Sequence, residues 1–196
     1  MTLGRPRDPS TQRSILAATR ALLATAGYDQ ISIDAIAREA DVSRPTVYRR
    51  WPSKAHVVFD AVFGAAEGGD ILTGTGDFAT DLGHFVRGVC EFWRDPVVAG
   101  ATMGILADRH RDPALSIRTQ QLLDEDTRRR FGVIVESGID QGVVAPHVDV
   151  DMLWDVLVGT ALYAVQVQRR DDVTDVAERL CALATKGAAI RPEEQP

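Results

Sequence analysis

SIDAIAREADVSRPTVYRRWPSK, residues 32–54, predicts two short helices joined by a tight turn. Its first serine is a favourable N-cap, and the isoleucines and alanines that follow recur at helical spacing, so they share one buried face. Ser43 caps the second helix, and Pro45 stands in the first turn, where a missing N–H costs nothing. The side of this helix that carries Val47 and Trp51 is apolar, and the other side is largely basic. Such a pair of helices is typical of a helix-turn-helix.

The same stretch resembles the TetR family of bacterial transcriptional repressors, and the resemblance extends from about residue 12 to residue 58. The matching residues are Ile36-Ala37, Ala40-Asp41-Val42-Ser43, Thr46-Val47-Tyr48-Arg49-Arg50-Trp51 and Ser53-Lys54. Asp41 is a departure, because the family usually has glycine there. That turn position often needs a left-handed backbone, which Asp tolerates better than most residues. We therefore expect the same turn at a slightly greater cost.

Charge is distributed unevenly along the chain. The 196 residues carry a formal net charge of −6, which by itself argues against a nucleic-acid partner. Residues 1–54, however, hold nine Lys or Arg against five Asp or Glu, a net of +4, which leaves −10 for the remainder. This asymmetry indicates a basic DNA-binding end attached to an acidic body that DNA would repel.

Helix signals elsewhere predict an all-α fold. Asp8-Pro9 is a cap followed by a first-turn proline, so we expect a helix that begins there and ends at Gly27. A linking helix is expected from Lys54 to about residue 66. The segment 64–76 is rich in glycine and is interpreted as a loose connector.

Beyond the connector the pattern is helical throughout. Asp95-Pro96 caps one helix, and Asp112-Pro113 caps another, which we expect to be long and to end near Gly142. We predict a three-helix DNA-binding domain with a helix-turn-helix at residues 1–54. Residues 55–196 are predicted to form a helical ligand-binding and dimerisation domain.

Basic and hydroxyl side chains of the helix-turn-helix are the candidates for DNA contact. We expect Tyr48 and Lys54 to bind phosphates, since Lys54 begins a helix whose N-terminal dipole also favours anions. Ser43 and Thr46 can bond the DNA backbone, and Arg44, at the tip of the recognition helix, is the candidate for reading guanine edges. The full set is Arg5, Arg7, Ser43, Arg44, Pro45, Thr46, Tyr48, Arg49, Arg50 and Lys54.

Several of these assignments have alternatives. Arg5 and Arg7 lie in a basic N-terminal arm that either follows the phosphate backbone, enters an adjacent minor groove or is only solvated. Arg49 and Arg50 either contact DNA, solvate the helix or pair with nearby acids. The alternative for Tyr48 is a half-buried core tyrosine.

Residues 151–170 have almost no polar side between Asp155 and Gln166. A surface helix of a monomer needs a polar face, so we expect this helix to be covered by its own domain on one side and by something else on the other. With the next helix, 173–187, it predicts a four-helix interface in a homodimer. The resemblance implies the same, since the family dimerises through its last two long helices. The alternative is the central core helix of a monomer. The candidates for dimerisation are Leu153, Leu157, Ala161, Val165, Val176, Leu180 and Leu183.

The resemblance also implies that the second domain senses a small molecule. Ordinary core packing is the alternative for each candidate for lining its site, and it is the favoured one for any single residue. The candidates are His84, Phe85, Trp93, Met103, His110, Phe131, Trp154 and Tyr163. A pocket lined by this set would accept a mostly apolar ligand.

Other function classes lack the patterns that they need. The four histidines are scattered without ligand spacing, and Cys90 and Cys181 have neither metal-type spacing nor a recognisable catalytic partner. We therefore expect no metal, no cofactor and no enzyme activity, and we interpret the cysteines as reduced core residues rather than a redox sensor. The N-terminus lacks the apolar core of a secretory signal, and we find no apolar run near the ~20 residues of a membrane span, so we expect a cytoplasmic protein.

These observations predict a ligand-responsive transcriptional repressor that binds palindromic double-stranded DNA as a homodimer and is released by a small, mostly apolar effector. A dimer would place two recognition helices ~34–36 Å apart, one turn of B-DNA. The alternative is a DNA-binding protein that is independent of ligand or is regulated by a protein partner. A fully packed second domain would favour this alternative.

Overall fold

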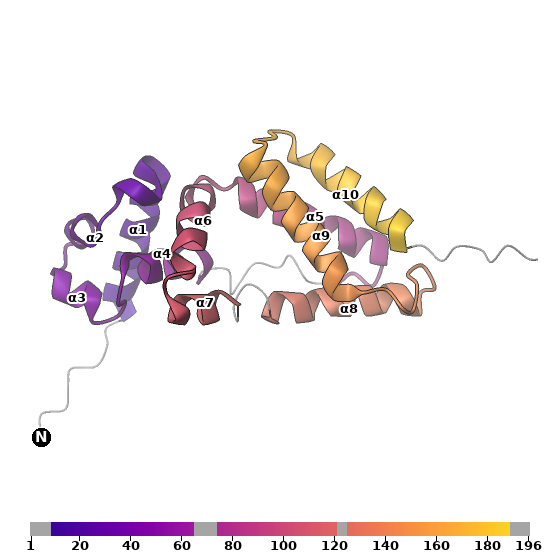
Figure 1. The fold of residues 1–196 in the computed structure, drawn as a ribbon, viewed down its shortest axis with the longest axis horizontal. Coiled ribbons are helices and arrows are strands. Elements are labelled where there is room, and N and C mark those ends of the chain that lie inside the picture. Colours follow the sequence, from indigo (N-terminus) through magenta and orange to yellow (C-terminus); the bar gives the residue numbers. More distant parts are fainter. Residues whose placement is uncertain (1–8, 65–73, 121–124, 189–196) are drawn as a thin grey trace, which may run out of the picture. The chain divides into compact units, whose positions relative to one another are not determined.

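The computed structural model describes residues 9–64, 74–120 and 125–188, and this part of the chain forms helices joined by turns, with no β-strand in it (Figure 1). The all-α prediction is confirmed. By compactness the chain divides into a first unit, Met1–Glu67 with Pro96–Arg118, and a second unit, Gly68–Asp95 with Thr119–Pro196. Two helices from beyond residue 95 therefore join the N-terminal helices. The functional boundary at residue 54 is a different division and stays a prediction.

The first unit contains the predicted helix-turn-helix. Its helices are α1 (Pro9–Gln30), α2 (Ile33–Glu39), α3 (Arg44–Tyr48), α4 (Lys54–Phe63), α6 (Pro96–Arg109) and α7 (Pro113–Gln120). The regular helix of α1 breaks at Gly27, where φ is 72°, as its glycine predicted. The cap expected at Asp8 lies outside the described residues.

Helix α4 is the centre of the first unit, because it packs against both α1 and α6. Almost all of its side chains are buried, and Val57, Val58 and Phe59 are completely so. Arg20 of α1 reaches this helix and donates from Nη1 to the carbonyl oxygen of Ala61 over 2.8 Å. The linking helix predicted from Lys54 is thus a core element of the first unit.

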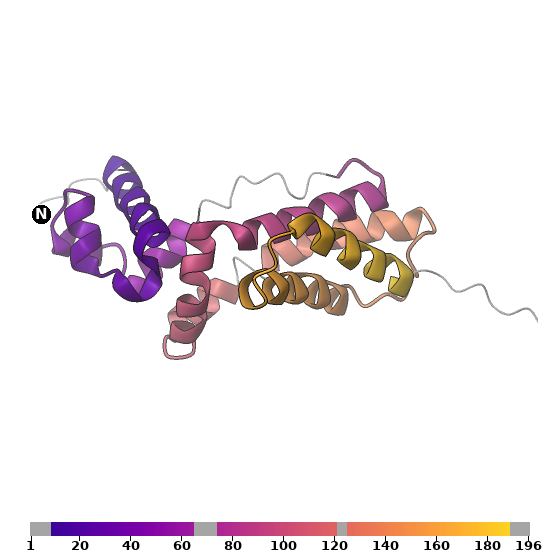
Figure 2. The ribbon, with the colours of Figure 1, turned by 90° about the horizontal axis from the view of Figure 1, so that it is seen from above.

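The second unit is a bundle of α5 (Phe78–Arg94), α8 (Asp126–Asp140), α9 (Val150–Leu162) and α10 (Val173–Ala188). A short π-helical segment, η3 (Tyr163–Val167), continues α9. In Figures 1 and 2, α5, α9 and α10 lie alongside one another, in agreement with their contacts. Asp77 caps α5 by accepting from the Thr80 backbone N–H over 2.8 Å, and Asp149 caps α9 in the same way.

The single helix expected from Asp112 to Gly142 is described in two parts, α7 and α8, and residues 121–124 between them lie outside the described residues. The two parts belong to different units. Leu115 of α7 is buried in the first unit, whereas Phe131 of α8 is buried in the second. The apolar residues that suggested one continuous face serve two separate cores.

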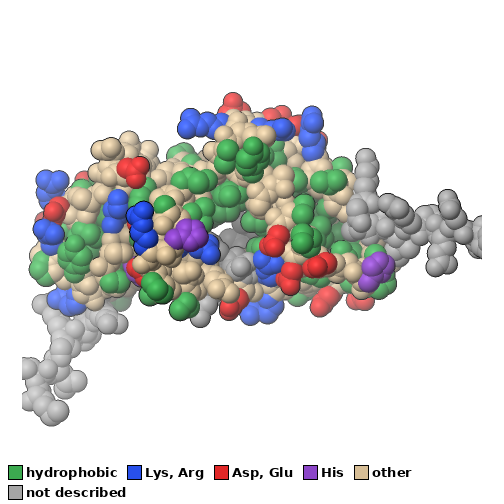
Figure 3. Space-filling view, viewed as in Figure 1, with side chains coloured by type: hydrophobic (Ala, Val, Ile, Leu, Met, Phe, Trp, Pro, Cys, Tyr) green, Lys and Arg blue, Asp and Glu red, His purple; other side chains and the backbone are tan. Residues whose placement is uncertain are grey.

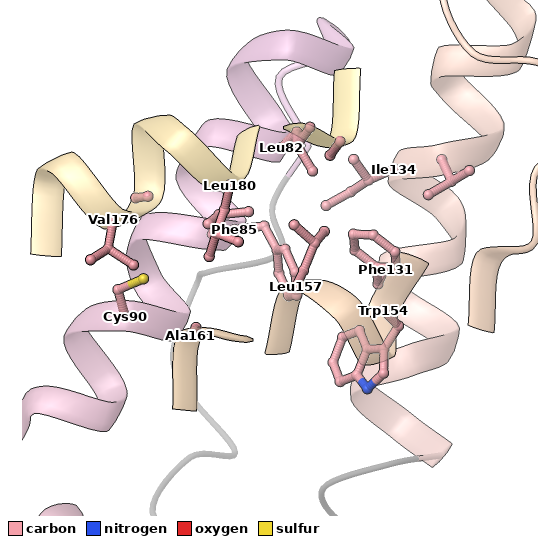
Figure 4. Close-up of a cluster of buried hydrophobic side chains, with 14 of the residues drawn as sticks. Leu82, Phe85, Cys90, Phe131, Ile134, Trp154, Leu157, Ala161, Val176 and Leu180 are labelled. Carbon is pink, nitrogen blue, oxygen red and sulfur yellow. The ribbon is translucent and has the colours of Figure 1, made fainter. Parts of the chain in front are cut away.

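The segment Val150–Val167 is long and apolar enough to span a membrane by length and composition alone. The expectation that no apolar run comes near the length of a membrane span therefore needs correction, although the same stretch was predicted to lack a polar side. Its side chains Trp154, Leu157 and Ala161 are buried in the core of the second unit (Figure 4). The packing of these three side chains accounts for part of its apolar character.

Candidate DNA-binding interface, dimer surface and effector region

The turn between α2 and α3 has the backbone that its sequence predicted. Asp41 adopts a φ of 51°, the left-handed conformation expected at the position where the family usually has glycine. The backbone N–H of Val42 donates to the carbonyl of Ala37 over 2.9 Å and closes the turn. Ser32 caps α2, since its Oγ accepts from the N–H of Ala35 over 3.2 Å.

Helix α3 has one buried and one exposed side. Val47 is fully buried and Trp51, just after the helix, is almost so, whereas 46% of Tyr48 is exposed. The predicted inward side is confirmed, and Tyr48 is not a core residue. The other candidate side chains of this stretch that are exposed are Ser43, Arg44, Pro45 and Arg49, while Thr46, Arg50 and Lys54 are half-buried.

Arg44 is held at the start of α3 by groups from two helices. Its Nε donates to Oδ1 of Asp34, on α2, over 2.7 Å, with both side chains more than half exposed. The Arg44 Cζ also lies 5.9 Å from the centre of the Tyr48 ring. Hydrogen bonding to Tyr48, followed by the charge of Asp34, raises the pKa of Arg44, so this guanidinium is a fixed positive charge.

Lys54 is oriented by the chain that precedes α2. Its Nζ donates to the carbonyl oxygen of Tyr28 over 2.8 Å and lies 4.1 Å from the centre of the Tyr28 ring. The Tyr28 hydroxyl donates to the carboxylate of Asp108 on α6, and burial together with that carboxylate raises the pKa of Tyr28. The position of Lys54 therefore depends on contacts with both α1 and α6.

A second set of contacts holds the end of the recognition helix. The indole Nε1 of Trp51 donates to Oδ2 of Asp60 on α4 over 2.6 Å, and Nη2 of Arg118 on α7 lies 2.5 Å from Oδ1 of the same carboxylate. Sequence reasoning missed Asp34, Tyr28 and Asp60, because their partners are 10, 80 and 9 residues away respectively along the chain and belong to other elements. The candidates Arg5 and Arg7 lie outside the described residues.

Charged and apolar side chains are both exposed on the face shown in Figure 3. Lys and Arg side chains are visible on both units, including the unit that carries α2 and α3, and hydrophobic side chains are visible on both as well. We define the apolar face as the exposed hydrophobic residues of α9, η3 and α10, namely Met152, Val156, Tyr163, Val167 and Leu183.

The residues predicted for dimerisation differ from this apolar face. Leu157, Ala161, Val176 and Leu180 are buried in the core of the second unit (Figure 4), and Val165 is buried in the same core. Leu153 is partly buried against the same core, and only Leu183 belongs to the apolar face. The choice of side chains therefore needs correction, because five of them already pack within one chain. The dimerisation of the two helices stays a prediction.

The residues predicted to line a ligand site are only partly brought together. Phe85, Phe131 and Trp154 form one cluster, with ring centres 4.7 Å apart for the two phenylalanines and 5.4 and 5.5 Å from Trp154 to each of them (Figure 4). Trp93 packs against the same core. His84 and Tyr163 are exposed, and Met103 and His110 belong to the first unit.

The cysteines fit the core interpretation. Burial raises the pKa of the Cys90 thiol to about 11 and also raises that of Cys181. Both thiols are therefore protonated at neutral pH and poorly reactive. Among the residues that the structure describes, no three His, Cys, Asp or Glu side chains form a group that could hold a metal ion.

Comparisons with known proteins agree with this architecture. The family model for bacterial regulatory proteins of the tetR family matches residues 15–61, and the model for the tetracyclin repressor-like C-terminal domain matches residues 72–184. An uncharacterized HTH-type transcriptional regulator of Mycobacterium tuberculosis is 30% identical over 180 residues, which cover 90% of this chain and 88% of the relative.

Solved structures give the same picture. The TetR family transcription regulator SCO0332 superposes with a TM-score of 0.71 at 25% identity, covering 93% of this chain and 100% of that one. FadR of Thermus thermophilus, a TetR family repressor in complex with lauroyl-CoA, superposes with a TM-score of 0.70 at 20% identity, covering 94% of this chain and 98% of that one. At this lower identity the likeness shows the fold alone.

Proposed function

This chain belongs to the TetR family of bacterial transcriptional regulators, and we propose that it is a repressor that binds palindromic DNA as a homodimer and is released by a small, mostly apolar effector. The observation that carries the proposal is the exposed side of α3, with Arg44, Tyr48 and Arg49, on a helix whose other side is buried. A recognition helix needs this combination, because the buried side fixes the angle at which the exposed side enters the major groove.

The DNA contacts divide by chemistry. Tyr48 and Lys54 bind phosphates, and Ser43 and Thr46, whose hydroxyl oxygens lie 2.9 Å apart, bond the DNA backbone. Arg44 reads a guanine edge, and Arg49 and Arg50 add contacts to phosphates or bases. The N-terminal residues Arg5 and Arg7 extend the basic surface along the duplex.

The apolar face supports the homodimer. Met152, Val156 and Tyr163 are exposed on one side of α9 and η3 although their neighbours pack into the core. A second copy that covers this side with its own α9 and α10 would bury these side chains in a four-helix interface. The dimer then presents two recognition helices to one palindrome.

The effector acts in the second unit. A ligand that is to release DNA must bind one arrangement of the dimer more tightly than the other, since equal affinity shifts nothing. The aromatic cluster of Phe85, Phe131 and Trp154 is the apolar centre that such a ligand would meet. The lauroyl-CoA bound by FadR of Thermus thermophilus suggests fatty acyl-CoA thioesters as first candidates.

The close ring contacts of this cluster also favour the competing hypothesis of a ligand-independent or protein-regulated DNA-binding protein, because such contacts fill a core. Thermal unfolding of the purified protein with acyl-CoA thioesters of graded chain length separates the two. A rise in Tm with one chain length, accompanied by loss of DNA binding, supports the sensor. An unchanged Tm across the series contradicts an acyl-CoA effector.

Selection of bound fragments from the host genome tests the function as a whole. The purified full-length chain should enrich fragments that share a palindrome with half-sites one helical turn apart. Enrichment of no common sequence would contradict operator binding. Transcription from the selected promoter should fall when the protein is added, and a rise would make it an activator.

A further inference from the structure

The ion pair between Arg44 and Asp34 has a geometry that suits base recognition. Oδ1 of Asp34 accepts from Nε of Arg44 over 2.7 Å, so the carboxylate occupies the side of the guanidinium that carries Nε. A bidentate contact with guanine uses two N–H groups of a guanidinium, and the two terminal nitrogens, Nη1 and Nη2, lie beyond the edge that Asp34 occupies. The bond therefore orients Arg44 without blocking its terminal end.

The donor count of the guanidinium allows this arrangement. Arginine has five N–H donors, of which Asp34 takes the one on Nε. The Arg44 Cζ lies 5.9 Å from the centre of the Tyr48 ring, and a bond to the Tyr48 hydroxyl would take one more donor and leave three, of which a guanine requires two. The Tyr48 hydroxyl can accept from Arg44 and still donate its own proton to a phosphate.

Stability alone does not explain the pair. Both side chains are more than half exposed, and ion pairs at such positions contribute little to folding. A carboxylate on the basic surface also repels phosphates and weakens binding to every sequence. The dipole of α2 favours an acid in its first turn by only about 0.3–1 kcal/mol, so Asp34 has a cost in affinity that a gain in specificity would offset.

We propose that Asp34 is a positioning residue that holds Arg44 in the orientation for bidentate recognition of one guanine in each half-site, and so sets the sequence specificity of the protein. The inference rests on the proposed DNA binding, and the ligand is a guanine presented in the major groove of duplex DNA. Asp34 itself does not touch the base.

The test compares three variants of the full-length protein on the duplex that the wild type selects from a random library. Asp34→Ala removes the carboxylate, Glu39→Ala removes an equal charge from the same helix, and Arg44→Ala removes the reading group. Each variant is titrated with the selected duplex, with duplexes in which each guanine is replaced in turn, and with duplexes that carry 7-deazaguanine, which lacks the N7 acceptor. Melting curves for all proteins show whether each variant is folded. An Asp34→Asn variant, which keeps the shape of the side chain and loses its charge, is titrated alongside them.

Wild-type protein should discriminate against replacement of one guanine by about 5-fold to 150-fold, the range of a good bidentate contact, and should lose affinity for the 7-deazaguanine duplex. Arg44→Ala should abolish both effects at that position. Asp34→Ala should lower the discrimination several-fold while binding unrelated duplexes more tightly. Glu39→Ala should show the same gain on unrelated duplexes with full discrimination, because it removes charge without moving Arg44.

Full discrimination in a folded Asp34→Ala protein would overturn the proposal. Increased discrimination would also overturn it and would show that Asp34 competes with DNA for Arg44. Discrimination that persists in Arg44→Ala would remove Arg44 as the reading group. If the wild type selects no common sequence, the proposed function itself fails, which is a different result from a wild type that discriminates by means of other residues.

Discussion

At the scale of single residues, two contacts fix the ammonium group of Lys54. Nζ lies over the Tyr28 ring and donates to the Tyr28 carbonyl oxygen. This hydrogen bond uses one of the three protons of the ammonium group. The remaining protons are available to a phosphate at the N-terminus of α4, where the helix dipole also favours an anion. The role that the sequence predicted for Lys54 is therefore compatible with its surroundings and stays a prediction.

Lys54→Ala should weaken binding to all duplexes alike, because a phosphate contact carries no sequence information. Each phosphate contact adds about 0.9 to the slope of log K against log salt, so the slope should fall by about one per subunit. Titration of a non-operator duplex at four salt concentrations measures this slope, and Lys54→Arg is the matched control that keeps the charge. A slope equal to that of the wild type would contradict the phosphate role.

Asp81, in the first turn of α5, is a residue with a pH-dependent role in stability. Its burial alone would raise the pKa of the carboxyl, but hydrogen bonds from the backbone and hydroxyl of Thr75, both 2.7 Å long, and from the N–H of Gly76 outweigh burial and lower that pKa. A lowered folded-state pKa means that the stabilisation is fully present above the unfolded pKa of about 3.9 and is lost as the pH falls through the folded value.

Asp81→Asn should therefore lower the free energy of unfolding at pH 7 by about 1–3 kcal/mol, since a buried acceptor of several bonds is lost. The difference from the wild type should shrink as the pH is lowered from about 4 towards 2. Urea unfolding followed by circular dichroism at pH 7 and near pH 2 measures this difference in the free energy of unfolding. Glu136→Gln, at an exposed position on α8, is the control. A difference that is the same at both pH values would show that the charge of Asp81 does not matter.

At the scale of helices, α6 packs closely on α1 through a glycine. A Cβ added at Gly104 would lie 2.1 Å from Cδ1 of Tyr28, so no side chain fits without moving the ring that carries Lys54. A Cβ at Gly132, inside α8, would meet nothing within 4 Å. Of these two helix-interior glycines, only Gly104 thus has a steric reason to be a glycine.

Gly104→Ala should destabilise the protein by about 1–3 kcal/mol through overpacking, and it should also weaken DNA binding because Tyr28 is displaced. Gly132→Ala should instead stabilise by about 0.5–1 kcal/mol, the usual gain for alanine inside a helix. Thermal melting of the two variants side by side checks both signs. A Gly104→Ala protein as stable as the wild type would show that the α1–α6 contact relaxes freely.

The same scale shows what could be predicted from the sequence. Caps and turn residues are local signals, so the helices α2 and α3 and the left-handed Asp41 were predicted correctly. The capping role predicted for Ser43 needs correction, because its hydroxyl makes no capping bond and lies 2.9 Å from the Thr46 hydroxyl instead. Contacts such as Tyr28 with Asp108 join residues far apart in sequence and have no local signature. Helix α9 is apolar on nearly every side, so hydrophobic spacing could not show that Leu157 faces its own core and Val156 the exterior.

At the scale of the whole molecule, the apolar face decides whether the chain is a dimer. Val156 is 38% exposed and its neighbour Leu157 is 1% exposed. A substitution at Val156 therefore tests the interface, whereas one at Leu157 tests the core of a single chain. A charge at Leu157 would disrupt the core of one chain, and a monomer obtained that way would say nothing about the interface. A charge at Val156 leaves the core intact.

Val156→Glu should therefore give folded monomers, because two copies of the new carboxylate would be buried without partners in the interface. Light scattering measures the mass, and circular dichroism verifies that the helices are retained. Val133→Glu, on the exposed side of α8 at 63% exposure, is the matched control and should remain a dimer. The monomer should also bind the palindrome much more weakly than the wild type while binding a half-site equally well, since the two recognition helices are then no longer linked. A Val156→Glu protein that remains a dimer would place the interface elsewhere on the second unit and would leave the exposed side chains of α9 without an explanation.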